Sequence, residues 1–133
     1  MIEGPAPQTP RDICGQKKGG DIRGVFAGHG IAGSVPLKIR ALIEAEIDAF
    51  DLSVLGARAS LVDFCQSLCA PRVTIVNFSG GFTQKCWSVT RSNGAYRVIF
   101  MPKAGYFSLC VESVFGPLDI GVHGDAIGCF GSV

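Results

Sequence analysis

Charge is scarce in this chain, long apolar runs are absent, and its cysteines and histidines do not form two pairs with the spacing of a metal site. Only 17% of its 133 residues are charged and the formal net charge is +1, so no strongly basic face is available to bind nucleic acid. No apolar run approaches the roughly 20 residues of a membrane-spanning helix. The cysteines never occur in the C-x-x-C spacing typical of zinc sites. We therefore expect no nucleic-acid partner, no membrane association, no metal and no cofactor.

Apolar residues, by contrast, make up 47% of the chain, which is high for a protein of this size. A chain of 133 residues is long enough for one domain with a core of its own. A small domain cannot hide all of this apolar surface, and large exposed patches usually mark contacts with a partner. We therefore expect the protein to bind itself as a homodimer.

Six cysteines are distributed through the chain: Cys14, Cys65, Cys69, Cys86, Cys110 and Cys129. Residues 1–10 contain three prolines and an acidic residue rather than the apolar segment of a secretion signal. The cysteines also lie within apolar patterns, where a free thiol behaves as a small hydrophobic side chain. These observations favour reduced cysteines and a cytoplasmic protein over a disulfide-bonded secreted one.

The chain divides into an arm and one domain. Residues 1–20 form a predicted Pro/Gly-rich arm, and residues 21–133 form a single predicted α+β domain. Residues 22–27 are a short apolar run and a candidate edge strand. Residues 28–33 (GHGIAG) match G-x-G-x-x-G, but Pro36 delays the next helix and the later strands are antiparallel. We therefore interpret residues 28–33 as a loop rather than a dinucleotide site.

Two helices are predicted in the first half of the domain. The first begins at Ser34, which can cap it while Pro36 occupies its first turn. Its apolar stripe recurs at helical spacing: Ile39, Leu42, Ile43, Ile47 and Phe50. The second is predicted over residues 52–69, with Asp51 as its cap and Pro71 just after its end.

From residue 73 onward the apolar pattern changes to alternation, which is typical of β-strands. Strands are predicted over residues 73–78, 86–91, 96–101, 106–113 and 118–123. Asn93 and Gly94 form the favoured two-residue hairpin turn, for which both residues should have positive φ. The predicted fold is α+β: two N-terminal helices packed on one face of a C-terminal antiparallel β-meander of four to five strands, with residues 22–27 as a candidate extra edge strand.

The positions of the turns determine which residues of neighbouring strands face each other. Turns at residues 93–94, 102–105 and 114–117 bring the bulky side chains onto one continuous apolar face, which the helices should cover. The opposite, outer face then carries a cluster of five polar or reactive side chains: Arg97, Cys110, Glu112, Asp119 and His123. In this register Arg97 faces Cys110 and Glu112 faces Asp119. Gly121 leaves an open notch beside Cys110.

This cluster is the predicted binding site, and its chemistry has more than one interpretation. Arg97 opposite the Cys110 thiol would favour the thiolate, and His123 could serve as a base, which is the pattern of a nucleophilic cysteine. The same charges could instead line a pocket for a polar small molecule, or pair with one another on a solvated or dimer-facing surface. We expect a small homo-oligomeric ligand-binding or protein-interaction module. The alternative is a small enzyme that uses Cys110 and His123.

Overall fold

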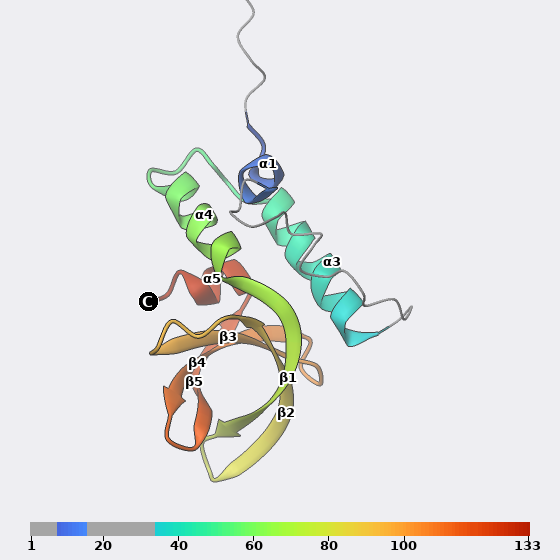
Figure 1. The fold of residues 1–133 in the computed structure, drawn as a ribbon, viewed down its shortest axis with the longest axis vertical. Helices are drawn as coiled ribbons and strands as arrows, with labels where there is room; N and C mark the ends of the chain where they lie inside the picture. Colours follow the sequence, from blue (N-terminus) through green and yellow to red (C-terminus); the bar gives the residue numbers. More distant parts are fainter. Residues whose placement is uncertain (1–7, 16–33) are drawn as a thin grey trace, which may run out of the picture.

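The computed structural model of the chain describes residues 8–15 and 34–133. Their helices and strands follow in the order α1 (Pro10–Gly15), α3 (Val35–Asp48), α4 (Ala57–Ser67), β1 (Leu68–Phe78), β2 (Phe82–Thr90), β3 (Tyr96–Met101), β4 (Tyr106–Ser113), β5 (Gly116–Gly124) and α5 (Ala126–Phe130). The helices gather on one side of the sheet, which curls into a ring beneath them (Figure 1). The candidate edge strand over residues 22–27 and the loop over residues 28–33 lie outside the described residues.

The five strands form a closed barrel in the order β1-β2-β3-β4-β5, so the protein is α+β with a closed rather than an open sheet. Consecutive strands are antiparallel, as in a meander. The first and last strands also meet, because β1 pairs with β5 in parallel at Asn77 and Leu118. The Asn77 amide reinforces this seam: its Nδ2 donates to the carbonyl oxygens of Phe115 at 3.0 Å and Pro117 at 3.2 Å. The face predicted to lie outside an open sheet therefore lines the inside of a barrel.

Helix α3 agrees closely with its prediction. The Ser34 hydroxyl accepts from the backbone N–H of Leu37 at 3.4 Å, and a proline occupies the first turn. The apolar stripe faces the core, where Ile39, Ile43 and Ile47 are almost fully buried. The spacing of the apolar residues was therefore sufficient to define this helix.

Helix α4 begins later and ends earlier than predicted. Its N-cap is Gly56, which has a φ of +81° and contributes no side-chain cap. The Asp51 carboxylate instead accepts from the backbone N–H of Ser53 at 2.9 Å, which closes a local turn before the helix. Strand β1 begins at Leu68, so Pro71 lies inside a strand rather than just after a helix. The β1–β2 register shifts between Leu68 and residue 72, and such irregularities accommodate proline.

The predicted register is confirmed from β2 to β4. Trp87 faces Phe100, and Phe100 faces Phe107. The turn between β2 and β3 differs in one respect: Gly94 has a φ of +97°, but Asn93 does not have a positive φ. The Asn93 carboxamide oxygen instead accepts backbone N–H groups two and three residues later, at 2.9 and 2.8 Å. The turn is therefore held by a side chain, and the facing residues are unchanged.

The hairpin between β4 and β5 turns earlier than predicted. Ser113 pairs with Gly116, so the turn consists of Val114 and Phe115 alone, not of residues 114–117. Gly116 has a φ of +105°, a conformation that glycine adopts without steric cost. The residues paired beyond this turn are shifted by two positions from the prediction.

This shift changes the neighbours of two predicted site residues. Cys110 faces Asp119 and not Gly121, while Glu112 faces Pro117 and not Asp119. The predicted like-charge pair of Glu112 and Asp119 is therefore wrong. The notch expected beside Cys110 is also wrong, because the Asp119 side chain takes that position.

A bulge in β5 restores the predicted register farther along the strand. Leu109 faces Val122 as predicted, and the register shifts between Leu109 and Cys110, where Ile120 and Gly121 are the extra residues. Gly121 has a φ of +82°, which suits a bulge. Because the bulge holds an even number of residues, the side chains beyond it keep their faces.

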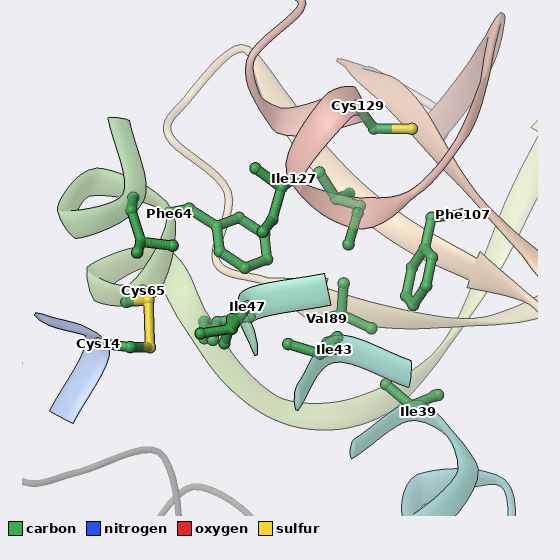
Figure 2. Close-up of a cluster of buried hydrophobic side chains, with 14 of the residues drawn as sticks. Cys14, Ile39, Ile43, Ile47, Phe64, Cys65, Val89, Phe107, Ile127 and Cys129 are labelled. Atoms are coloured by element: carbon green, nitrogen blue, oxygen red, sulfur yellow. A yellow bond between two sulfur atoms is a disulfide. The ribbon is translucent and has the colours of Figure 1, made fainter. Parts of the chain in front are cut away.

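The larger core lies between the helices and the outer face of the barrel (Figure 2). Phe64 of α4 and Ile127 of α5 pack there with the isoleucines of α3 and with Val89 and Phe107 of the sheet. Phe64 and Val89 are fully buried. None of the described helices is long and apolar enough to cross a membrane.

The short helix α5 is held against α3 by a carboxylate. Glu46 Oε2 and Oε1 accept the backbone N–H groups of Ala126 at 3.0 Å and Ile127 at 2.9 Å. These N–H groups open the first turn of α5, where they have no partner within the helix. Burial raises the pKa of Glu46 above its usual range, although the two hydrogen bonds oppose this rise.

A disulfide between Cys14 and Cys65 ties α1 to α4 (Figure 2). The Arg11 guanidinium also holds α1 to α3, because its Nε and Nη2 donate to the Asp48 carboxylate at 2.9 and 2.7 Å. The prediction that all the cysteines are reduced is therefore wrong for this pair, while the other four form no disulfide. The predicted cytoplasmic location rested partly on reduced cysteines, and the disulfide removes that part of its support.

Candidate functional site

The inner face of the barrel is filled by its own side chains. It contains a second, smaller apolar cluster made of Val76, Cys86, Ile99, Met101 and Cys110. Ser88, Thr90 and Ser108 are also buried, and no buried side-chain nitrogen or oxygen atom of the described residues lacks a hydrogen-bond partner. The interior is therefore a packed polar–apolar mixture, and an open site must lie at its ends or outside it.

Asp119 is the centre of a polar group on the inner face of the barrel, and this group reaches solvent at His123. Its Oδ1 accepts from the Ser108 hydroxyl, and its Oδ1 and Oδ2 lie 3.1 and 3.2 Å from His123 Nε2. The His123 ring stacks on Tyr106, with 5.1 Å between the ring centroids. Since Asp119 stands between the hydroxyl and the imidazole, these residues lack the contact from nucleophile to base that a hydrolytic triad requires.

The Cys110 thiol is poorly suited to act as a nucleophile. It is fully buried, and burial together with the nearby Asp119 carboxylate raises its pKa to about 12. Arg97 faces Cys110 as predicted, but its charge lowers the pKa by less than burial raises it. Burial likewise raises the pKa of Cys86 to about 11. Both thiols remain protonated near neutral pH, which argues against the thiol–imidazole enzyme.

Arg97 and Glu112 form an ion pair at one end of the barrel. Arg97 Nη2 donates to Glu112 Oε2 at 3.0 Å, and Nε donates to Oε1. Both side chains are roughly three-quarters buried, at 24% and 23% exposure. The five predicted site residues therefore separate into this pair and a second group, in which Cys110 is buried, Asp119 is partly buried and His123 is exposed.

A cavity of about 400 Å³ opens beside Arg97, and we call it the mouth cavity. Its polar lining comes from β1, β2, the following turn and β3: Arg72, Thr74, Ser88, Thr90, Arg91, Ser92 and Arg97. None of the described residues that line it is acidic. Three guanidinium groups line one cavity, and because Glu112 neutralises only Arg97, the site is positive in a protein with little overall charge.

The three arginines of the mouth cavity differ in how they are held. Arg97 is paired with Glu112, and Arg91 donates through Nη2 to the carbonyl oxygen of Gln66. Arg72 is exposed and makes no ion pair or side-chain hydrogen bond with the rest of the described chain. No carboxylate of the described residues pairs with Arg72 or Arg91, so both charges remain available to a ligand.

A second cavity of about 590 Å³, the helix-side cavity, lies between the end of α4, α5 and the β2–β3 hairpin. The sheet side chains in its lining are Val98 and Leu109, both 1% exposed, with Tyr96 beside them. Phe130 of α5 also lines it. This volume is in the range of small-molecule pockets.

No set of three or more His, Cys, Asp or Glu side chains in the described ranges could hold a metal ion. Comparisons of the chain with protein-family models, with curated proteins and with solved structures find no match. The function must therefore be inferred from the geometry of the chain and the groups that line its cavities.

Sequence reasoning found Arg97 but missed Arg72 and Arg91. In the sequence Arg72 lies between the second predicted helix and the first predicted strand, and Arg91 is the last residue of a predicted strand, so neither position indicated a site. One signal was present: Arg91 and Arg97 flank the turn at residues 93–94, so a hairpin brings both to the same end of the sheet. Arg72 joins them only because β1 pairs with β2, where Arg72 faces Ser88.

Proposed function

We propose that this protein binds a small molecule through a phosphate-like anionic group in the mouth cavity. The observation that supports this most directly is the set of Arg72, Arg91 and Arg97 around one cavity whose described lining has no acidic residue. Guanidinium groups donate paired N–H bonds that match the oxygens of phosphate or carboxylate.

The hydroxyl groups of the lining favour a phosphate-like group in particular. Thr90 Oγ1 accepts the backbone N–H of Val98 at 3.0 Å, and Ser92 Oγ accepts that of Gly94 at 3.1 Å. A hydroxyl that accepts in this way keeps its own O–H to donate. A tetrahedral oxyanion offers more acceptor positions than a carboxylate, so it can use several such donors at once.

Titration calorimetry with inorganic phosphate tests the proposal. The exposed side chain of Arg72 allows substitution without loss of the fold, so Arg72→Gln is the informative variant. We expect the dissociation constant to rise about tenfold or more, because a hydrogen bond to a charged group contributes roughly 1.5–3 kcal/mol.

Lys103→Gln is the matched control, because it removes one positive charge from the turn at the other end of β3. Its affinity for phosphate should equal that of the wild type. The proposal fails if the wild type does not bind phosphate at millimolar concentration, or if the two substitutions weaken binding equally.

We also propose that the protein forms a homodimer through the outside of the seam between β1 and β5. Exposed apolar side chains of β1, of β5 and of the turn before β5 belong to this region, and we call them the seam patch: Val73, Ile75, Val114, Phe115 and Ile120. Phe115 is 85% exposed, and its carbonyl oxygen is bonded to Asn77 of β1. Apolar surface of this kind on a small domain usually marks a contact.

Light scattering after size-exclusion chromatography tests self-association. The wild type should have twice the mass of the chain, and the double variant Ile75→Lys, Phe115→Lys should have the mass of a monomer. Leu55→Lys is the control, because Leu55 is fully exposed in the segment between α3 and α4. A monomeric wild type, or a double variant that stays dimeric, would contradict this interface.

A further inference from the structure

We infer that the ligand has two parts: a phosphate group in the mouth cavity and a flat apolar body in the helix-side cavity. This inference rests on the proposed function, because the phosphate group is the part that the three arginines bind. What it adds is the chemical class of the whole molecule, an aromatic phosphate ester rather than free phosphate.

The two cavities adjoin one another. Thr90, Arg91 and Arg97 line both of them. The paired residues of β2 and β3 end at Ser88 and Ile99, and beyond them the Thr90 hydroxyl, rather than a backbone carbonyl, accepts the next N–H from β3. The ends of these strands therefore stand between the two cavities, and a ligand that passes them can reach both.

The helix-side cavity has the surface expected for an apolar body. Val98 and Leu109 are core residues of the sheet, and Tyr96 and Phe130 add aromatic rings at the sides. Phe130 is fixed by an edge contact with Phe64, at 5.5 Å between ring centroids. A contact between two aromatic rings contributes more free energy than the buried area alone would give.

The charges of the two cavities give the ligand one orientation. The helix-side cavity carries Asp63 in its lining, whereas the described lining of the mouth cavity is free of carboxylates. A phosphate group is repelled by Asp63 and attracted by Arg72, which lines only the mouth cavity. The anionic end should therefore lie at the mouth, with the body toward α5.

Calorimetric titrations with inorganic phosphate and with 1-naphthyl phosphate test the inference. The naphthyl ester should bind at least tenfold more tightly than phosphate, because burial of a ring of this size adds apolar contact area. Phe130→Ala should weaken the naphthyl ester about fivefold or more and leave the affinity for phosphate unchanged. Arg72→Gln should weaken both probes.

Phe130 also packs against the core, so Phe130→Ala could weaken binding by disturbing the fold. A second variant of the same cavity is therefore needed. Val133 lines the same cavity and is 62% exposed, which makes Val133→Gln safe for the fold. This variant should weaken the naphthyl ester alone.

Each outcome separates the two proposals. Equal affinities for the two probes would overturn the two-part ligand and leave the phosphate site standing. If the naphthyl ester binds more tightly than phosphate but neither Phe130→Ala nor Val133→Gln weakens it, the naphthyl ring lies outside the helix-side cavity and the inference fails. If neither probe binds, the proposed function itself is wrong.

Discussion

Removal of the Cys14–Cys65 disulfide should lower the stability of the protein by about 4 kcal/mol. The two cysteines are 51 residues apart in the chain, and the entropy lost when a loop of that length is closed amounts to about 4 kcal/mol at 25 °C. This value lies between the roughly 3 kcal/mol of a 15-residue loop and the roughly 4.7 kcal/mol of a 100-residue loop. It is a large part of the total stability of a small domain.

Urea denaturation with and without dithiothreitol measures this contribution. The reductant reaches the cysteines in the unfolded chain, so the wild type should lose most of the 4 kcal/mol and unfold at lower urea. The double variant Cys14→Ala, Cys65→Ala should be destabilised to a similar or greater extent and should not respond to the reductant. Thiol titration in urea should find four reactive thiols before reduction and six after it, since the other four cysteines form no disulfide. Superimposable curves for the wild type, or six free thiols without reductant, would refute the reasoning.

Three further predictions follow from single side chains. Ser34→Ala should lower the free energy of unfolding by about 1 kcal/mol in urea denaturation, because it removes the cap of α3. Cys110 should resist iodoacetamide near pH 7 in the folded protein and react after unfolding, as peptide mass mapping can show, because burial raises its pKa to about 12. Glu46 has a raised pKa when folded, so its contribution to stability is complete below pH 4.5 and is lost as the pH rises through the folded pKa. Denaturation at several pH values should show this loss in the wild type but not in Glu46→Gln.

The sequence was sufficient where local patterns decide the structure. The stripe of α3 and its cap at Ser34 depend on neighbouring residues, and both agree with the structure. The pairing of Trp87 with Phe100 followed from a turn that is encoded at residues 93–94. In both cases a single short segment contains all the information that is needed.

The features that the sequence did not reveal depend on contacts between distant segments or on prolines in strands. Closure of the barrel requires Asn77 to meet Leu118, and no local pattern encodes that contact. Pro71 and Pro117 were both interpreted as breaks, yet Pro71 lies in β1 and Pro117 lies in β5, one residue past a tight turn. The disulfide is also a distant contact, because spacing alone does not determine which cysteines pair.

The candidate site was likewise predicted correctly where one turn decides it, and missed where distant segments meet. The ladder between β3 and β4 placed Arg97 opposite Cys110 correctly, since only one turn separates their strands. Whether that face is exposed or enclosed depends on closure, so the solvent access of Cys110 could not be judged from alternation. Arg72 lies near Arg97 only because β1 pairs with β2 and β2 pairs with β3. The β1–β2 pairing also contains a register shift, which the sequence does not indicate.

The seam between β1 and β5 also decides where the barrel opens first. Its ladder has one pair of backbone partners, Asn77 and Leu118, whereas β3 and β4 share six. A short ladder costs little free energy to break, so local opening should begin there and expose the edges of β1 and β5 to solvent. In hydrogen–deuterium exchange the amides along these two edges would then exchange earliest among the strands, and replacement of Asn77 by alanine would speed their exchange without affecting the centre of β3.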